Sequence, residues 1–238
     1  MDHLVVGAGE MGRWFAGVIG GDLAFADLDS TAASEAAAAF EGRVADDGDT
    51  FELVTVAVPL PAATAAVEEH APRAREAVVD LTGRMADPLA AMADTVPDRE
   101  RLSIHPLFAA ENAPGNVAVA AENGGPTTDR VLDALRDAGN DLVEVAPAEH
   151  DRAMRTVQGR AHAAILAFGL AAEEVPAGLE TPVYEALTDL LEQVTGGTPR
   201  VYADIQAAFG GADDVADAAR RIAEADSETF ADLYEDAR

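Results

Sequence analysis

Residues 4–29 read LVVGAGEMGRWFAGVIGGDLAFADLD, which is a short apolar run, a glycine-rich turn, a helical stretch and a second apolar run. Gly7 lets the chain turn tightly after the first run, and Gly9 lets backbone N–H groups approach a pyrophosphate. Gly12 lets the helix pack closely on the sheet, so that its N-terminus faces the phosphate charge. This order of elements predicts a dinucleotide-binding unit.

Asp27 directly follows the second apolar run, Leu23 to Ala26. It lies about twenty residues past the first glycine, where a carboxylate can bind the ribose 2′-hydroxyl of a dinucleotide. The same carboxylate repels the 2′-phosphate of NADP, because the two charges have the same sign. The sequence therefore predicts NAD as the cofactor.

The composition excludes several classes of protein. The 238 residues hold no cysteine, which excludes disulfides, a thiol nucleophile and thiolate metal ligands. No cluster of His and Asp residues predicts a metal site. No run of about eighteen apolar residues predicts a membrane span, and no secretion signal opens the chain. We therefore expect a cytoplasmic protein that needs no metal.

The charge balance is strongly acidic, with 16 basic against 44 acidic residues and a net charge of −28. All basic residues are arginine, which excludes Schiff-base chemistry and a P-loop because both need lysine. No basic stripe is present to contact nucleic acid. An acidic, lysine-free chain with ordinary hydrophobicity is typical of a protein from a salt-rich cytoplasm, where salt screens the self-repulsion.

The first part of the chain, residues 1–147, alternates between apolar runs and alanine-rich helical stretches. The expected strands are 3–6, 23–26, 53–58, 77–81, 102–105, 117–121 and 142–145, and the expected helices between them are 30–40, 62–70, 88–95 and 128–138. Apolar runs without alternation are typical of parallel strands that are covered on both faces. The pattern predicts an α/β fold, a doubly wound Rossmann-type domain that binds the dinucleotide.

The second part, residues 148–238, is predicted to be all-helical. The expected helices are 149–172, 182–194, one that starts at Pro199 with Thr198 as its cap, and 212–234. A helical domain after a nucleotide-binding domain usually closes the active site over the substrate and often pairs two subunits.

His105 is the strongest candidate for chemistry outside the glycine turn. It ends an apolar strand and is followed at once by Pro106, which fixes the exit of the chain. Ligands of open α/β sheets bind at the carboxyl ends of the strands, so we expect His105 to face the nicotinamide. A neutral imidazole there can take a proton from a substrate hydroxyl while hydride leaves the same carbon. The alternative is a histidine that is satisfied by backbone groups.

His150 and His162 are expected on one helix, twelve residues apart and so on roughly the same face. Gln158 lies four residues before His162, so that both can line the same site. For each histidine alone, a role in the core or as a cap is the favoured interpretation.

At these residues the chain resembles the prephenate/arogenate dehydrogenase family. The specific segments are His105-Pro-Leu-Phe108 and Glu149-His-Asp-Arg152 with Gln158 and His162; the weaker ones include Gly7–Trp14, Val56–Pro59, Asp80–Gly83 and Val201–Ile205. The resemblance implies an N-terminal nucleotide-binding domain and a C-terminal helical domain that forms a homodimer. It also implies that Glu10, Met11, Val58 and Pro59 join Gly7, Gly9, Gly12 and Asp27 in the cofactor site.

The reaction that the resemblance implies is the NAD-dependent oxidative decarboxylation of prephenate to 4-hydroxyphenylpyruvate, in the synthesis of tyrosine. The residue that matches His105 binds the ring hydroxyl and removes its proton. The family's usual serine is absent after the strand that ends near Asp80, and Thr82 is the expected substitute. The family's usual carboxylate-binding arginine aligns with Gln193. Because prephenate is a dianion, we expect a cation from the set Arg84, Arg152, Arg155 and Arg160.

The sequence leaves other functions open. Arogenate dehydrogenase differs from the leading hypothesis only in the substrate. Another small reductase with a Rossmann domain and a helical tail is a second alternative. A regulatory protein that binds NAD without catalysis is the third, since the usual serine and arginine are absent.

Overall fold

The computed structural model describes all 238 residues, and the chain divides into two compact units, residues 1–151 and 152–238. The first unit is built on one eight-stranded sheet with the strand order β3-β2-β1-β4-β5-β6-β7-β8. The strands are β1 (Asp2–Val6), β2 (Asp22–Ala26), β3 (Arg43–Val44), β4 (Phe51–Val56), β5 (Ala74–Asp80), β6 (Glu100–Pro106), β7 (Asn116–Glu122) and β8 (Asp141–Glu144). The order from β3 to β6 is that of a Rossmann fold, which confirms the predicted α/β class.

The strands pair in parallel except for β6 and β7, which are antiparallel. All seven predicted strands are present, and the two-residue β3 is the one strand that the sequence does not predict. The direction of β7 departs from a purely parallel sheet because residues 107–115 are too few for a crossover, which needs a dozen residues or more. The two reversed strands, β7 and its parallel neighbour β8, lie beyond β6, so they leave the nucleotide-binding part of the sheet intact.

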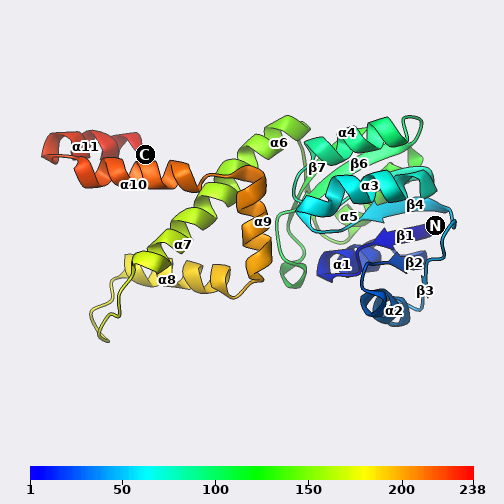
Figure 1. Cartoon of the computed structure of the whole chain (residues 1–238), viewed down its shortest axis with the longest axis horizontal. Helices are drawn as coiled ribbons and strands as arrows, with labels where there is room; N and C mark the ends of the chain where they lie inside the picture. Colours follow the sequence, from blue (N-terminus) through cyan, green and yellow to red (C-terminus); the bar gives the residue numbers. More distant parts are fainter. The chain divides into compact units, whose positions relative to one another are not determined.

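Helices cover both faces of the sheet, as Figure 1 shows, with α3 (Ala63–His70) and α4 (Ala86–Thr95) on one face. On the other face lie α1 (Glu10–Ile19), α2 (Ser30–Ala39) and α5 (Pro126–Asp137). Phe15 of α1 and Leu135 of α5 pack into one buried cluster, whereas Leu89 and Met92 of α4 pack into the cluster on the opposite face. Because both faces are buried, the strands carry apolar residues without alternation.

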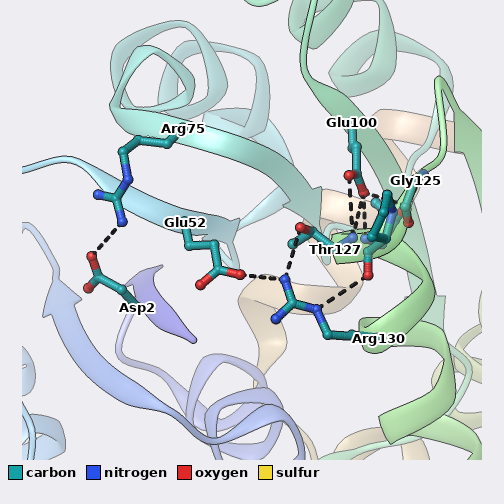
Figure 2. A network of polar contacts seen from close by, with 9 residues as sticks. Asp2, Glu52, Arg75, Glu100, Gly125, Thr127 and Arg130 are labelled. Carbon is teal, nitrogen blue, oxygen red and sulfur yellow. Dashed lines mark hydrogen bonds and ion pairs between the residues drawn. The ribbon is translucent and has the colours of Figure 1, made fainter.

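Ion pairs and caps fix the starts of the strands, the ends remote from the glycine turn. Figure 2 shows Asp2 of β1 paired with Arg75 of β5, and Glu52 of β4 paired with Arg130 of α5. The Glu100 carboxylate accepts hydrogen bonds from the Thr127 and Thr128 amides, at 3.0 and 2.7 Å. A carboxylate at a helix N-terminus satisfies amides that have no partner in the helix, so Glu100 caps α5.

The second unit is helical. It follows α6 (Pro147–Met154), which begins in the first unit, and comprises a π-helical segment η4 (Arg155–Arg160), α7 (Ala161–Ala171), α8 (Pro182–Thr195), α9 (Pro199–Phe209), α10 (Ala212–Glu224) and α11 (Ser227–Asp236). The single helix predicted over 212–234 is wrong, because the chain breaks at Ala225 and Asp226. Asp226 accepts a hydrogen bond from the Thr229 amide and so caps α11. None of the helices has the length and apolar character that a membrane span requires.

Candidate active site

The glycine-rich turn lies where the strand order reverses, between β1 and β4. Gly7 follows β1 with φ at 98°, and a Cβ built on it would lie 2.2 Å from the carbonyl oxygen of Ala57. A Cβ built on Gly12 of α1 would lie 2.0 Å from the carbonyl oxygen of Gly7. Both glycines are therefore required by the packing of the protein on itself.

Gly9 differs from the other two glycines of the turn. It is the exposed N-cap of α1, and no atom lies within 4 Å of a Cβ built on it. The chain itself would therefore accept a side chain at this position. The space above Gly9 and the N-terminal amides of α1 together fit the close approach of a pyrophosphate, so the residues present fit a dinucleotide.

Asp27 directly follows β2, and its carboxylate reaches the glycine turn. One carboxylate oxygen accepts a hydrogen bond from the Ala8 amide at 2.7 Å, and the other accepts one from the Asp29 amide at 2.9 Å. Each carboxylate oxygen has two lone pairs, so both retain capacity for a ribose hydroxyl. The structure thus brings Asp27 to the turn, as the sequence predicts.

The four remaining residues predicted for the cofactor lie beside the same turn. Glu10 and Met11 form the first turn of α1, where Glu10 is exposed and Met11 is half-buried. Val58 and Pro59 follow β4, and a Cβ built on Gly7 would lie 3.3 Å from the Val58 side chain. The carboxylate of Glu10 faces solvent, and its charge makes it an unsuitable ligand for phosphate.

His105 lies near the carboxyl end of β6 and is buried, with 7% of its surface exposed. Its Nδ1 lies 3.0 Å from Nε2 of His150, and the two rings meet edge to face at 5.1 Å. A Cβ built on Gly83 would lie 3.1 Å from Nε2 of His105. Burial, with a smaller effect of His150, lowers the pKa of His105 to about 3, so the imidazole is neutral near pH 7. His105 thus contacts another side chain, whereas the alternative interpretation expects its partners to be backbone groups.

Thr82 belongs to a buried loop that the Asp80 carboxylate organises. Asp80 accepts hydrogen bonds from the Thr82 amide at 3.0 Å and from the Ser103 hydroxyl at 2.8 Å. The Thr82 hydroxyl donates to the carbonyl oxygen of Arg84 at 3.3 Å, within the loop itself. The loop residue that packs on His105 is Gly83.

The buried Asp80 carboxyl is expected to make the stability of the protein depend on pH. Burial raises the pKa of this carboxyl from 3.8 to about 7. A raised pKa gives a stabilising contribution that is complete below pH 3.8 and is lost as the pH rises through 7. Asp80→Asn is therefore expected to match the wild type near pH 4 and to be more stable by a few kcal/mol at pH 8, since one pKa unit is about 1.4 kcal/mol. Urea unfolding at both pH values measures the difference.

His3 is a second buried group that makes the stability depend on pH. It is buried, it shares a hydrogen bond of 2.9 Å with the Thr55 hydroxyl, and burial lowers its pKa to about 3. A lowered histidine pKa makes the protein less stable as the pH falls below 6.5, the opposite direction to Asp80. Because His3 is present in both proteins, its effect cancels in the comparison. An equal stability difference at pH 4 and pH 8 would contradict the assignment to Asp80.

The predicted substrate arginines differ in their partners. Within the second unit, the guanidinium groups of Arg155 and Arg160 both pair with the Asp214 carboxylate, at 3.0 and 2.9 Å. Arg152 is exposed, and no ion pair or hydrogen bond engages its side chain. In the first unit, Arg84 pairs with Asp87 at 3.2 Å and lies 3.9 Å from Asp151. Arg152 is thus the one cation of the predicted set that can bind an anion without losing a partner.

The π-helical segment of the second unit carries Gln158. Within it, Gly159 lies so close to the chain after α9 that a Cβ would lie 2.1 Å from the Gly210 carbonyl oxygen. The Gln206 side chain donates to the Gly159 carbonyl oxygen at 2.7 Å, which satisfies a group of the widened turn. Such π segments occur frequently at functional sites.

His162 follows the π segment and is half-buried against Tyr202, with ring centroids 4.9 Å apart. Its buried Nδ1 has no hydrogen-bond partner within the protein, and burial lowers its pKa. A buried polar atom without a partner costs free energy unless a water or a ligand bonds to it. His162 therefore presents a buried nitrogen that a water or a ligand can satisfy.

The sequence favours a role in the core or as a cap for His150, and it gives Asp151 no separate role. The structure joins both to His105 through hydrogen bonds within the first unit. The signal was present as the adjacent His-Asp pair, but its partner lies 45 residues earlier in the chain. No group of three or more acidic or histidine side chains is arranged to hold a metal.

The sheet order and the glycine turn define a Rossmann-fold protein with a site for NAD(P). No family model matches the chain. In sequence it is 29% identical to the 4-amino-4-deoxyprephenate dehydrogenase of Streptomyces pristinaespiralis, over 99% of this chain and 89% of that protein. It is 28% identical to a probable arogenate/prephenate dehydrogenase of Methanocaldococcus jannaschii, over 65% of this chain and 38% of that protein.

The fold is that of the prephenate dehydrogenases. The crystal structure of prephenate dehydrogenase from Aquifex aeolicus superposes with a TM-score of 0.74 at 15% identity, over 100% of this chain and 98% of that one. A second structure of that enzyme, in complex with hydroxyphenyl propionate and NAD+, superposes with a TM-score of 0.70 at 16% identity, over 99% and 96%. At these identities the likeness shows the fold alone, and the two relatives in sequence support the prephenate/arogenate dehydrogenase family.

Proposed function

We propose that this chain is an NAD-dependent dehydrogenase that oxidatively decarboxylates prephenate to 4-hydroxyphenylpyruvate. The observation that carries the proposal is a buried, neutral histidine, His105, near the carboxyl end of a strand in a Rossmann sheet. The similarity to a 4-amino-4-deoxyprephenate dehydrogenase along 99% of the chain supports the same type of reaction. Prephenate and 4-amino-4-deoxyprephenate each contain a carboxylated, non-aromatic ring that becomes aromatic.

His105 is the proposed base of this reaction. NAD, when bound, supplies an acceptor for the hydride that leaves the ring carbon bearing the hydroxyl. Nε2 of His105 takes the hydroxyl proton as the C–H bond of that carbon breaks. The ring carboxylate departs as CO₂, its bonding electrons complete the aromatic ring, and His105 returns the proton to the phenolate oxygen. The protein therefore supplies positioning and one proton transfer, and the aromatic product drives the reaction.

Arg152 is the proposed partner of a substrate carboxylate. A guanidinium that is already paired must give up that partner before it binds a substrate, as Arg155 and Arg160 must with Asp214. Arg152 has no such competitor, and its planar fork matches a carboxylate in two hydrogen bonds. His162, Gln158 and Thr82 remain proposed contacts of the substrate.

NAD rather than NADP is the proposed cofactor, because the Asp27 carboxylate lies at the turn where the ribose binds. Asp27→Asn keeps an oxygen that can accept from the Ala8 amide but removes the negative charge. We expect the ratio of kcat/KM for NAD to that for NADP to fall by roughly 10-fold or more, since a charged hydrogen bond to the ribose and the repulsion of the 2′-phosphate are both lost. Steady-state assays with both cofactors measure this ratio.

The neighbouring Asp29→Asn is the matched control for this cofactor prediction. Asp29 caps α2 through the Thr31 amide and loses the same charge on substitution. Its cofactor ratio is expected to stay within about twofold of the wild type, because its carboxylate does not contact the glycine turn. An equal change in both variants would show that general charge, not Asp27, sets the preference.

A substrate panel tests the proposed activity. The purified chain is assayed with prephenate, arogenate and 4-amino-4-deoxyprephenate, each with NAD and NADP, by the absorbance of the reduced cofactor. We expect the highest kcat/KM with prephenate and NAD. A higher kcat/KM with 4-amino-4-deoxyprephenate or with arogenate would assign that compound as the substrate and leave the proposed type of reaction unchanged. Tight NAD binding without any turnover would favour the regulatory alternative, and oxidation of NADH or NADPH by imines in a parallel assay would favour a different reductase.

A homodimer in a salt-rich cytoplasm is the proposed state of the protein, with residues 148–238 as the dimerisation and substrate-closing domain. Helix α7 reads AHAAILAFGLA, is apolar on every side, and has no buried residue, so a second copy is a suitable cover. The net charge of −28 calls for screening by salt. Light scattering and thermal melts in dilute and in molar salt test both statements.

A further inference from the structure

We propose that His150 and Asp151 are positioning residues that fix the tautomer of His105, so that its Nε2 carries the lone pair. The inference rests on the proposed function in that it assigns His105 as the base. All three residues belong to the first compact unit: His105 lies on β6, and the other two lie on α6. His105 and His150 are buried, with 7% and 2% of their surfaces exposed.

The direction of the hydrogen bonds follows from Asp151. Its carboxylate can only accept, so the contact of 2.8 Å requires that Nδ1 of His150 donate a proton. In a neutral His150, Nε2 then carries the lone pair and accepts across the 3.0 Å contact to His105. The donor in that contact is Nδ1–H of His105. A neutral His105 with its proton on Nδ1 has its lone pair on Nε2, the nitrogen beside Gly83.

Asp151 is held in place as an ionised acceptor. Its two carboxylate oxygens accept hydrogen bonds from the Met85 and Ala86 amides, at 3.0 and 3.1 Å, at the start of α4. Burial alone would raise the pKa of Asp151, but the hydrogen bonds from His150 and from these two amides together lower it. An ionised Asp151 cannot donate to His150, so the order of donors and acceptors cannot reverse without loss of a hydrogen bond.

The arrangement has a consequence for the proton transfer. If His150 presented an N–H to His105, then Nε2 of His105 would itself carry a proton and could not take one from a substrate. When His105 accepts the substrate proton, it becomes an imidazolium whose Nδ1–H donates to His150. The Asp151 carboxylate, one residue further along the hydrogen bonds, offsets this positive charge. His150 thus selects the reactive tautomer, and the Asp151 carboxylate favours the protonated form.

Nitrogen NMR of the protein without substrate tests the tautomer directly. In protein with ¹⁵N-labelled histidine, a nitrogen with a lone pair and one with a proton give well-separated shifts. The chain has five histidines, so single variants assign each signal. We expect His105 to show a protonated Nδ1 and an unprotonated Nε2 near neutral pH. The opposite pattern would overturn the inference even if the enzyme turned over prephenate.

Asp151→Asn tests the origin of the tautomer. The asparagine oxygen can still accept from the Ala86 amide of α4. Its NH2 group then replaces the oxygen that faces both His150 and the Met85 amide, so it can donate to His150 and reverse both tautomers with loss of the Met85 hydrogen bond. We expect the His105 signals to exchange and kcat to fall by roughly 10²- to 10⁴-fold with little change in the KM for NAD. Glu149→Gln, which neutralises an exposed carboxylate in the same turn of α6, is the control and is expected to leave both unchanged.

His150→Gln and His150→Leu give a second, independent comparison. The glutamine carbonyl oxygen can accept from Nδ1–H of His105, whereas leucine cannot, so glutamine is expected to keep at least 10-fold more kcat than leucine. Equal kcat in the two variants, at wild-type thermal stability, would contradict a role through the hydrogen bond. Expected NMR signals without turnover of any substrate would instead refute the proposed function and leave the tautomer assignment intact.

Discussion

Replacement of His105 by asparagine is expected to lower kcat with prephenate by roughly 10²- to 10⁴-fold, the contribution of a positioned general base. Asparagine keeps a polar group that can donate to Nε2 of His150, so the buried hydrogen bond of 3.0 Å is retained in kind. It cannot take a proton near neutral pH. The loss should therefore appear in the chemical step and not in the fold.

Cofactor binding separates this outcome from a general defect. Asp27 holds the glycine turn through the Ala8 amide, and the substitution leaves this hydrogen bond in place. The Kd for NAD, measured by calorimetry, is therefore expected to stay within about twofold of the wild type. His70→Asn is the control, because His70 ends α3 and lies outside the proposed site. A His105→Asn enzyme with kcat near that of the wild type would refute the assignment of the base.

The part of the fold that the sequence predicts is the part governed by local patterns. Gly7, Gly12 and Asp27 each have a local mechanical reason, and the structure brings all three to one turn. The break after α10 also had a local signal that the alanine-rich pattern hid. Asp226, followed three residues later by Thr229, forms an N-cap. The direction of β7 could have been inferred from the short connection that precedes it.

The rest depends on contacts between residues far apart in the chain. His105 and His150 approach each other because β6 ends beside the start of α6, and no periodicity in either segment encodes that approach. The partners of the arginines are equally non-local: Asp214, on α10, engages two of the four predicted cations. Which arginine remains available for an anion therefore cannot be predicted from the arginines alone.

Gly12→Ala is expected to be the most damaging substitution that adds a single methyl group to the nucleotide-binding unit. The added Cβ would lie 2.0 Å from the carbonyl oxygen of Gly7, a backbone atom that cannot turn away. Helix α1 must then move away from the sheet, which separates its N-terminal amides from the turn that receives the pyrophosphate. We expect a loss of stability of roughly 1–3 kcal/mol or more and a rise in the Kd for NAD of at least 100-fold.

Gly17→Ala is the matched control, because Gly17 is exposed on the same helix and its Cβ would lie 3.6 Å from the Phe40 ring, an ordinary contact. Alanine favours a helix interior over glycine by about 1 kcal/mol, so this variant should be as stable as the wild type or more so. Calorimetric titration with NAD and thermal melts of the two variants separate helix propensity from the close approach at Gly12. If Gly12→Ala bound NAD as tightly as Gly17→Ala, the turn would not be the pyrophosphate site, and the Rossmann sheet would have to bind its ligand elsewhere.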